Sequence, residues 1–204
     1  MAQPLGTHIG NALEVKDAID VLAGRTQGDL LEISLLLGSH MLVLAEKAKT
    51  LPEARAMLEN ALSSGAGLRK LAEMIAAQGG DPRVVEDLSL LPQAAVKRVM
   101  RAETAGYLSA MDTTALGMAA QRMGAGRAKK SDMLDYSVGY VLHVRLGDEV
   151  TEDTPLATLY ARNEAEAEEA EKAIRKALTI AKEKPQTPKL WDAVVTAEGI
   201  TYNR

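Results

Sequence analysis

The stretch Ala102–Gly126, AETAGYLSAMDTTALGMAAQRMGAG, decides the fold class because its pattern changes twice within a short span. The residues around Gly106 alternate as they do in a β-strand. Asp112 then stands where a helix N-cap is expected, directly before the apolar helical run TTALGMAAQRM. Gly124-Ala-Gly126 ends that run. A strand, a cap and a helix in direct succession indicate a domain that mixes α and β structure.

Further along the chain, the pattern continues to predict strands with one long helix between them. Residues 136–150 and 155–161 alternate as strands. Residues 163–183 predict a charged helix that buries its alanine face together with Leu178, and residues 190–195 return to a strand pattern. The second half is therefore predicted to be α+β, with a mainly antiparallel sheet.

The first ninety residues are predicted to be almost entirely helical. Helical spacing of apolar residues predicts helices at residues 11–23, 29–48, from Thr50 onward and 67–80, with a short helix starting at Asp81-Pro82. Thr50 and Glu53 have the spacing of a capping box. Residues 29–48 are apolar on nearly every face up to Ala45, which is typical of a central, buried helix.

The composition favours a globular protein that does not bind nucleic acid or a membrane. Hydrophobic residues make up 47% of the chain and the formal net charge is −4, whereas a nucleic-acid surface needs a basic excess. No apolar run approaches the roughly 20 residues that a membrane helix needs. The chain has no cysteine, so it has no disulfide framework or thiolate zinc site, which fits a cytoplasmic protein.

Few residues carry a recognisable catalytic pattern. His8, His40 and His143 stand alone in the sequence, outside any known ligand spacing. The glycines of GAGR at 124–127 follow a helix, whereas a phosphate loop precedes one, so a helix C-cap and turn is favoured over an anion site.

The segments GYLSAMD and VRLGDEVTEDTPLATLYA resemble the two halves of a biotinyl or lipoyl carrier domain. The carrier lysine would stand at Ala110-Met111-Asp112, where Asp112 has no amine to acylate. We therefore expect a barrel-sandwich-like sheet without biotin or lipoate.

Longer stretches resemble the thymidine and pyrimidine-nucleoside phosphorylase family. They are QPLGTHIGNALEVKDAIDVLAG at Gln3–Gly24, and AETAGYLSAMDTTALGMAAQRMGAGR with SDMLDYSVGYVLHVRLGD within residues 102–148. Their order and spacing match the C-terminal half of the family. The resemblance implies reversible phosphorolysis, in which phosphate attacks a pyrimidine nucleoside to give the free base and a pentose 1-phosphate.

The same resemblance implies an incomplete catalytic apparatus in this chain. The family's phosphate loop, of K-H-S-T-G-G-V-G-D-K type, and the residues that hold the pyrimidine have no counterpart in the sequence. We therefore expect the chain alone to be an inactive C-terminal half that self-associates or binds a complementary N-terminal chain. The alternative is a non-catalytic folded module, left by truncation or gene splitting.

The resemblance also implies a division of the chain and one ion site. Residues 1–91 would be the helical part of a larger α/β catalytic domain, and residues 92–204 an α+β C-terminal domain. Some family members bind a monovalent cation, such as potassium, through two backbone carbonyls and one acidic side chain. The matching positions are Leu5, His8 and Asp17. Apart from the resemblance, Asp17 is equally interpreted as an exposed acid on an amphipathic helix.

Overall fold

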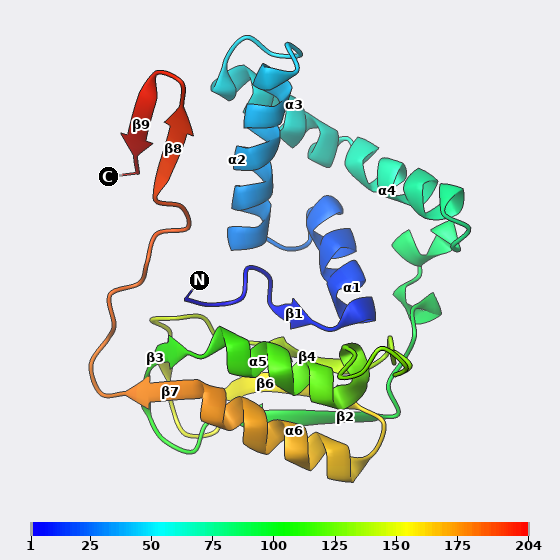
Figure 1. Cartoon of the computed structure of the whole chain (residues 1–204), viewed down its shortest axis with the longest axis vertical. Coiled ribbons are helices and arrows are strands. Elements are labelled where there is room, and N and C mark those ends of the chain that lie inside the picture. The colour runs from blue at the N-terminus through cyan, green and yellow to red at the C-terminus, as the bar shows by residue number, and fades with distance from the viewer. Residues whose placement is uncertain (1, 204) are drawn as a thin grey trace.

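The structure is a computed structural model that describes residues 2–203, and it sets a group of helices above a layered α+β region (Figure 1). The helices of the first part follow one another closely along the chain. They are α1 (Asn11–Leu22), α2 (Asp29–Leu44), α3 (Leu51–Ser63) and α4 (Ala66–Ala77), followed by the short 3₁₀ turns η1 (Pro82–Val85) and η2 (Leu88–Leu90).

The C-terminal region is built on two antiparallel sheets. The larger has the order β1-β4-β6-β2 and the smaller the order β5-β3-β7. The strands are β1 (His8–Ile9), β2 (Val96–Arg101), β3 (Gly106–Met111), β4 (Gly139–Leu142), β5 (Glu149–Val150), β6 (Pro155–Ala161) and β7 (Leu178–Ala181). The predicted α+β class with a mainly antiparallel sheet is confirmed, and the sheets of the described residues do not close into a barrel.

Helices α5 (Thr113–Ala120) and α6 (Glu164–Ala177) lie side by side across the larger sheet (Figure 1). They close one continuous core that runs from Met100 to Ala177. The Tyr140 hydroxyl is buried in that core, where it donates a hydrogen bond of 2.8 Å to the Leu116 carbonyl. This hydrogen bond gives the only polar atom of the buried Tyr140 side chain a partner.

The predicted helix 163–183 is too long. It begins at the Asn163 cap but ends at Ala177, and Leu178–Ala181 form β7, which pairs with β3. Strand pairing overrides the helical spacing because Thr179 and Ile180 are β-branched and the open edge of β3 offers them backbone partners.

The prediction for residues 29–48 is wrong in both length and burial. Helix α2 ends at Leu44, and only Leu31, Leu35 and Ser39 are buried. Leu37, Met41 and Leu44 are 56%, 68% and 83% exposed. The physical reason is that α1 and α3 cover only part of the circumference of α2 within residues 2–203.

Two local predictions about helix starts and stops are confirmed. Asp112 caps α5 by accepting a hydrogen bond from the Ala115 amide at 2.9 Å, and Thr50 caps α3 through the Glu53 amide. After α5, a π-helical turn η3 (Gln121–Ala125) ends with Gly124 at a φ of 108°, so the GAGR glycines terminate a helix as expected. Among the described helices none has both the length and the apolar character to span a bilayer.

A short crossing joins the two parts of the molecule. β1 pairs with β4, so His8 and Ile9 belong to the sheet of the C-terminal region. Gly139 has a φ of +148°, and a Cβ there would stand 2.1 Å from the Ile9 carbonyl oxygen. Only glycine allows this approach. The division of the chain at residues 91 and 92 stays a prediction, and β1 already crosses it.

At the C-terminal end, β8 (Ala193–Thr196) and β9 (Gly199–Tyr202) form a hairpin that stands apart from both sheets (Figure 1). The predicted strand at 190–195 corresponds to β8, and its partner β9 was not expected.

Candidate functional site

The segment from Gln3 to Asp17 carries the residues predicted to hold a cation. It forms a turn at Gln3–Gly6, the edge strand β1, and then the first two turns of α1. The turn lies against the loop that follows β4, so it contacts the C-terminal region before the chain enters α1.

Asp17 is buried rather than exposed, with 3% of its surface accessible. Its carboxylate lies 3.4 Å from the Nδ1 atom of His8, and a Cβ on Gly6 would meet the other carboxylate oxygen at 2.5 Å. Burial lowers the pKa of His8, although the nearby Asp17 carboxylate opposes that shift. The interpretation of Asp17 as an exposed acid is therefore wrong.

The backbone carbonyl of His8 is directed away from the sheet. The Thr7 carbonyl accepts a hydrogen bond of 2.8 Å from the Leu142 amide, and His8 is the next residue along the ladder. Hydrogen-bonded and non-hydrogen-bonded pairs alternate in an antiparallel ladder. His8 therefore turns its carbonyl toward the open edge of β1.

The third predicted ligand is already engaged by a cationic side chain. The Leu5 carbonyl oxygen lies 3.3 Å from an Nη atom of Arg145, and the same guanidinium reaches the Pro4 carbonyl at 2.8 Å and the Gly6 carbonyl at 3.3 Å. As the turn stands, the Leu5 oxygen does not fit a free cation, because a second positive charge would be placed beside the guanidinium. The sequence pattern does not indicate Arg145, since a single arginine after a strand usually lies in solvent.

Two further side chains complete this network. Arg145 donates to the Asp29 carboxylate at 2.7 Å, and that carboxylate also accepts a bond of 3.2 Å from the Gln3 amide group. The Gln3 side-chain oxygen accepts from the Leu146 amide at 3.0 Å. These hydrogen bonds therefore join three segments: the start of α2, the Gln3–Gly6 turn and the loop after β4.

His143 has a different environment. Its Nε2 atom lies 2.7 Å from the hydroxyl of Thr158 on β6. Burial lowers the pKa of His143, and the positive charge of Lys97 lowers it further. Within residues 2–203, no three His, Cys, Asp or Glu side chains are arranged to hold a metal ion.

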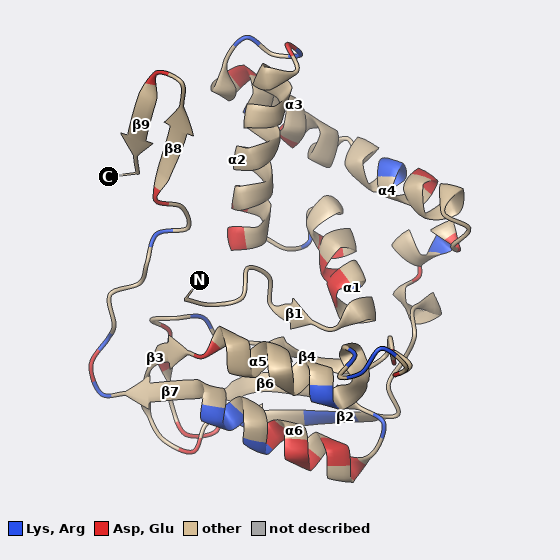
Figure 2. Ribbon diagram, viewed as in Figure 1, with Lys and Arg blue, Asp and Glu red and all other residues tan. Residues whose placement is uncertain are grey.

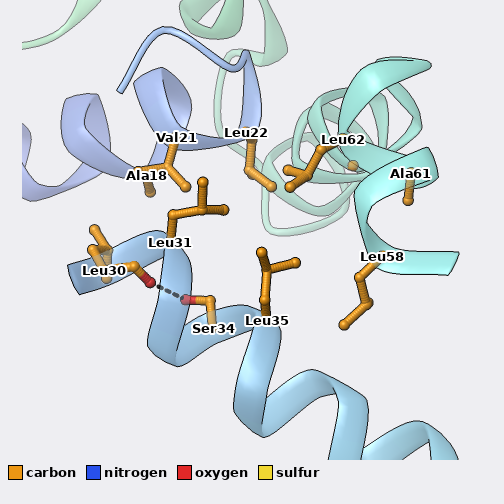
Figure 3. Close-up of a pocket in the computed structure, with 11 residues that line it drawn as sticks. Ala18, Val21, Leu22, Leu30, Leu31, Ser34, Leu35, Leu58, Ala61 and Leu62 are labelled. Atoms are coloured by element: carbon orange, nitrogen blue, oxygen red, sulfur yellow. Dashed lines mark hydrogen bonds between the residues drawn. The ribbon is translucent and has the colours of Figure 1, made fainter. Parts of the chain in front are cut away.

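A second candidate site is an apolar groove of about 370 Å³ among α1, α2, α3 and the start of α4 (Figure 3). In Figure 3, Leu31 and Leu35 of α2 face Leu62 across the groove. Ser34 is the one polar side chain in the lining, and it donates to the Leu30 carbonyl at 2.7 Å. Such a lining suits apolar side chains and offers no group for acid–base chemistry.

The surface of α2 extends this apolar character. Figure 2 shows that α2 is charged only near its start, at Asp29 and Glu32. Leu37, Met41 and Leu44, which we call the α2 patch, lie exposed beyond those charges. Contiguous exposed apolar patches can mark contacts with another protein.

The sequence of the C-terminal region matches one known domain family. Residues 107–181, from β3 to the end of β7, match the family model of the pyrimidine nucleoside phosphorylase C-terminal domain and belong to that family. The resemblance seen in the sequence is therefore confirmed for this part of the chain.

Similarity to individual proteins extends well beyond that domain. The chain is 50% identical over 164 residues to the pyrimidine-nucleoside phosphorylase of Bacillus subtilis (strain 168), covering 80% of this chain and 38% of that protein. It is 44% identical over 181 residues to the pyrimidine-nucleoside phosphorylase of Staphylococcus aureus (strain N315), covering 89% of this chain and 42% of that protein. The chain thus spans about two fifths of the length of these relatives.

Proposed function

We propose that this chain is the C-terminal part of a pyrimidine-nucleoside phosphorylase, a pentosyltransferase. The reaction is the attack of phosphate on a pyrimidine nucleoside, which yields the free base and a pentose 1-phosphate. The observation that carries this proposal is the 50% identity over 164 residues to the Bacillus subtilis pyrimidine-nucleoside phosphorylase.

The chemistry of this reaction requires groups beyond those of the chain. Phosphate needs anion-binding donors, and the departing base needs stabilisation of its developing negative charge. The GAGR glycines end a helix, and Arg145 is occupied by the Gln3–Gly6 turn and Asp29. We assign the phosphate- and base-binding groups to a complementary polypeptide, so the chain alone is inactive.

The α2 patch and the adjoining groove are the surface that supports such a partner. Covering one large aliphatic side chain is worth roughly 1.5–3 kcal/mol, so leaving several in water weakens the helical part. A complementary N-terminal half would cover this surface, and in its absence the chain would associate with itself.

Reconstitution tests the proposal directly. The chain is purified alone and mixed with the part of the Bacillus subtilis enzyme that precedes the matched region, and thymine release from thymidine and phosphate is followed. We expect turnover from the mixture only, and a uridine arm reports which base is accepted. Turnover by the chain alone at ordinary enzyme rates would contradict the proposed division of labour.

The exposed α2 patch also supports the second candidate, a non-catalytic module that binds a complementary half. The same mixture distinguishes the two functions, since a stable complex without thymine release favours the module. A matched control carries Leu37→Gln, Met41→Gln and Leu44→Gln, which should weaken the complex in either case.

Two narrower proposals accompany this function. The domain carries no biotin or lipoate, because Asp112 stands at the carrier position and its carboxylate caps α5. The cysteine-free sequence supports a cytoplasmic location.

A further inference from the structure

The Gln3–Gly6 turn directs consecutive carbonyl oxygens toward one point. The oxygens of Pro4, Leu5 and Gly6 all lie within 3.3 Å of Arg145 nitrogen atoms. A ring of backbone carbonyls is a site for positive charge, whether the charge is a metal ion or a side chain. Here the chain itself supplies the charge.

We propose that the Arg145 guanidinium is a built-in cation for this turn, a positioning residue that holds the Gln3–Gly6 segment in place and occupies the Leu5 carbonyl, one of the three ligands that the family resemblance assigns to a monovalent metal ion. The inference rests on contacts within this chain and is independent of the proposed reaction.

The geometry of the guanidinium suits this role better than that of a point charge. One Nη atom serves the Pro4 and Gly6 carbonyls, while the other serves the Leu5 carbonyl and the Asp29 carboxylate. Arginine has several donors in a fixed planar fork, so it can satisfy divergent acceptors at once. A lysine ammonium has three donors at one atom and would serve this set less completely.

The charge balance of the site supports the same assignment. The Asp29 side chain is 39% exposed and the Arg145 side chain 24% exposed, so the pair is partly shielded from water. Removing the guanidinium would leave the Asp29 carboxylate and three carbonyls without their common donor. Water reaches these acceptors only in part, so an added small cation would take the place of the lost donor.

The consequence reaches beyond the turn itself. The turn leads directly into β1 and α1, and Asp29 is the first residue of α2. Arg145 follows β4 in the C-terminal region. The guanidinium therefore links the start of the helical part to the loop after β4.

The experiment measures amide hydrogen exchange of residues 5–10 and of Leu146 in the full chain. Wild type, Arg145→Ala and Arg145→Lys are compared in potassium chloride, guanidinium chloride at low concentration and choline chloride, all at equal ionic strength. Arg101→Met is the matched control, because Arg101 donates to the Asp153 carbonyl from β2, the strand at the opposite edge of the sheet from β1.

We expect wild-type exchange to be the same in potassium and choline. Arg145→Ala should exchange about tenfold faster or more in this segment, since the hydrogen bonds from a charged donor to three carbonyls are lost. Arg145→Lys should be intermediate, Arg101→Met should leave the segment unchanged, and guanidinium or potassium should slow exchange in Arg145→Ala relative to choline.

Three results would overturn the proposal. One is saturable protection of the wild-type segment by potassium, which would show that a free ion is still required. Another is unchanged exchange in Arg145→Ala. The third is faster exchange that neither potassium nor guanidinium slows, which would reduce Arg145 to a packing role. If Arg145→Ala does not fold, Arg145→Lys in the same three salts decides the question, because its intermediate protection should respond to guanidinium and not to choline.

Discussion

Helix α2 carries charges only at Asp29 and Glu32, whereas α6 carries acidic and basic side chains along its whole length (Figure 2). The highly charged helix α6 is nevertheless the more deeply buried of the two. In α6, the alanine face and Ile174 are buried against the sheet, and Ile174 has no accessible surface. In α2 beyond Ser39, Met41 and Leu44 are exposed, and the apolar residues between them are only partly buried. The comparison teaches that a neighbouring surface, and not the average hydropathy of a helix, decides what is buried.

The same contrast holds for the two regions as wholes. The C-terminal region has one continuous core from Met100 to Ala177. The helical part has two small clusters, one around Ile19 and one around Leu31 and Leu35. Small, separate clusters give each helix fewer partners, so the helical part should be the first to open.

The largest expected effect comes from truncating the buried side chain of α6. Ile174→Ala leaves a cavity in the continuous core and should lower the free energy of unfolding by about 2–5 kcal/mol. Leu44→Ala in α2 is the control and should change it by less than about 0.5 kcal/mol, because Leu44 is 83% exposed. Urea denaturation measures both. If both variants lower the free energy of unfolding equally, Leu44 is covered by other residues, and the contrast between α2 and α6 is wrong.

The next prediction concerns local opening. Amide exchange should be at least about tenfold faster in α2 than in α6, because an opening of α2 exposes less buried apolar surface. Peptide-level exchange with mass spectrometry resolves the two helices. Strong and uniform protection across residues 11–90 would mean that the helical part closes its own core.

A smaller effect on stability, with a visible effect on association, is expected at the α2 patch. The triple variant Leu37→Gln, Met41→Gln and Leu44→Gln should alter the free energy of unfolding by about 0.5 kcal/mol or less per site. It should also reduce self-association in light scattering. Met133→Gln is the control, since Met133 is 89% exposed in the other region. If both variants associate equally, the α2 patch is not the contact.

The smallest effect is a pH dependence in the C-terminal region. The folded state lowers the pKa of His143, chiefly through burial and also through Lys97, so the unfolded chain binds a proton more readily. The stability contribution of neutral His143 is fully present above its ordinary pKa of 6.5 and is lost as the pH falls from there through the folded-state pKa. Thermal unfolding between pH 7.5 and pH 5 should show this decline.

His143→Gln keeps a hydrogen-bonding group near Thr158 and should make that decline shallower. The part of the decline that remains is assigned to His8, because burial lowers the pKa of His8 as well. A profile that is unchanged in His143→Gln would assign the decline to other groups. Because His143 is only partly shielded from water, the effect is smaller than those of the preceding substitutions.

Features that depend on short stretches of sequence could be predicted. The caps Asp112 and Thr50, the stop at Gly124 and the strands β3 and β6 each follow from a few neighbouring residues. The strand β7 could not be predicted, because its pairing with β3 joins Leu178 to Met111, far apart in the chain. Local spacing alone favoured a longer helix there.

The candidate site divides in the same way. The sequence pointed to the Gln3–Asp17 segment, and the structure brings His8 and Asp17 together. It did not indicate Arg145, whose role depends on contacts with Pro4 and Asp29 from distant parts of the chain. The cation ligands Leu5, His8 and Asp17 remain a prediction, and the engaged Leu5 carbonyl is the observation against it.

The sequence by itself determined the α+β class, the helix caps and the relationship to the pyrimidine-nucleoside phosphorylases, because these depend on local patterns and on long matching motifs. The tertiary structure alone decided which face of α2 is covered, where α6 gives way to β7, and which charge holds the Gln3–Gly6 turn. Burial, strand pairing and salt bridges between distant residues depend on which surfaces meet, and a local pattern does not contain that information.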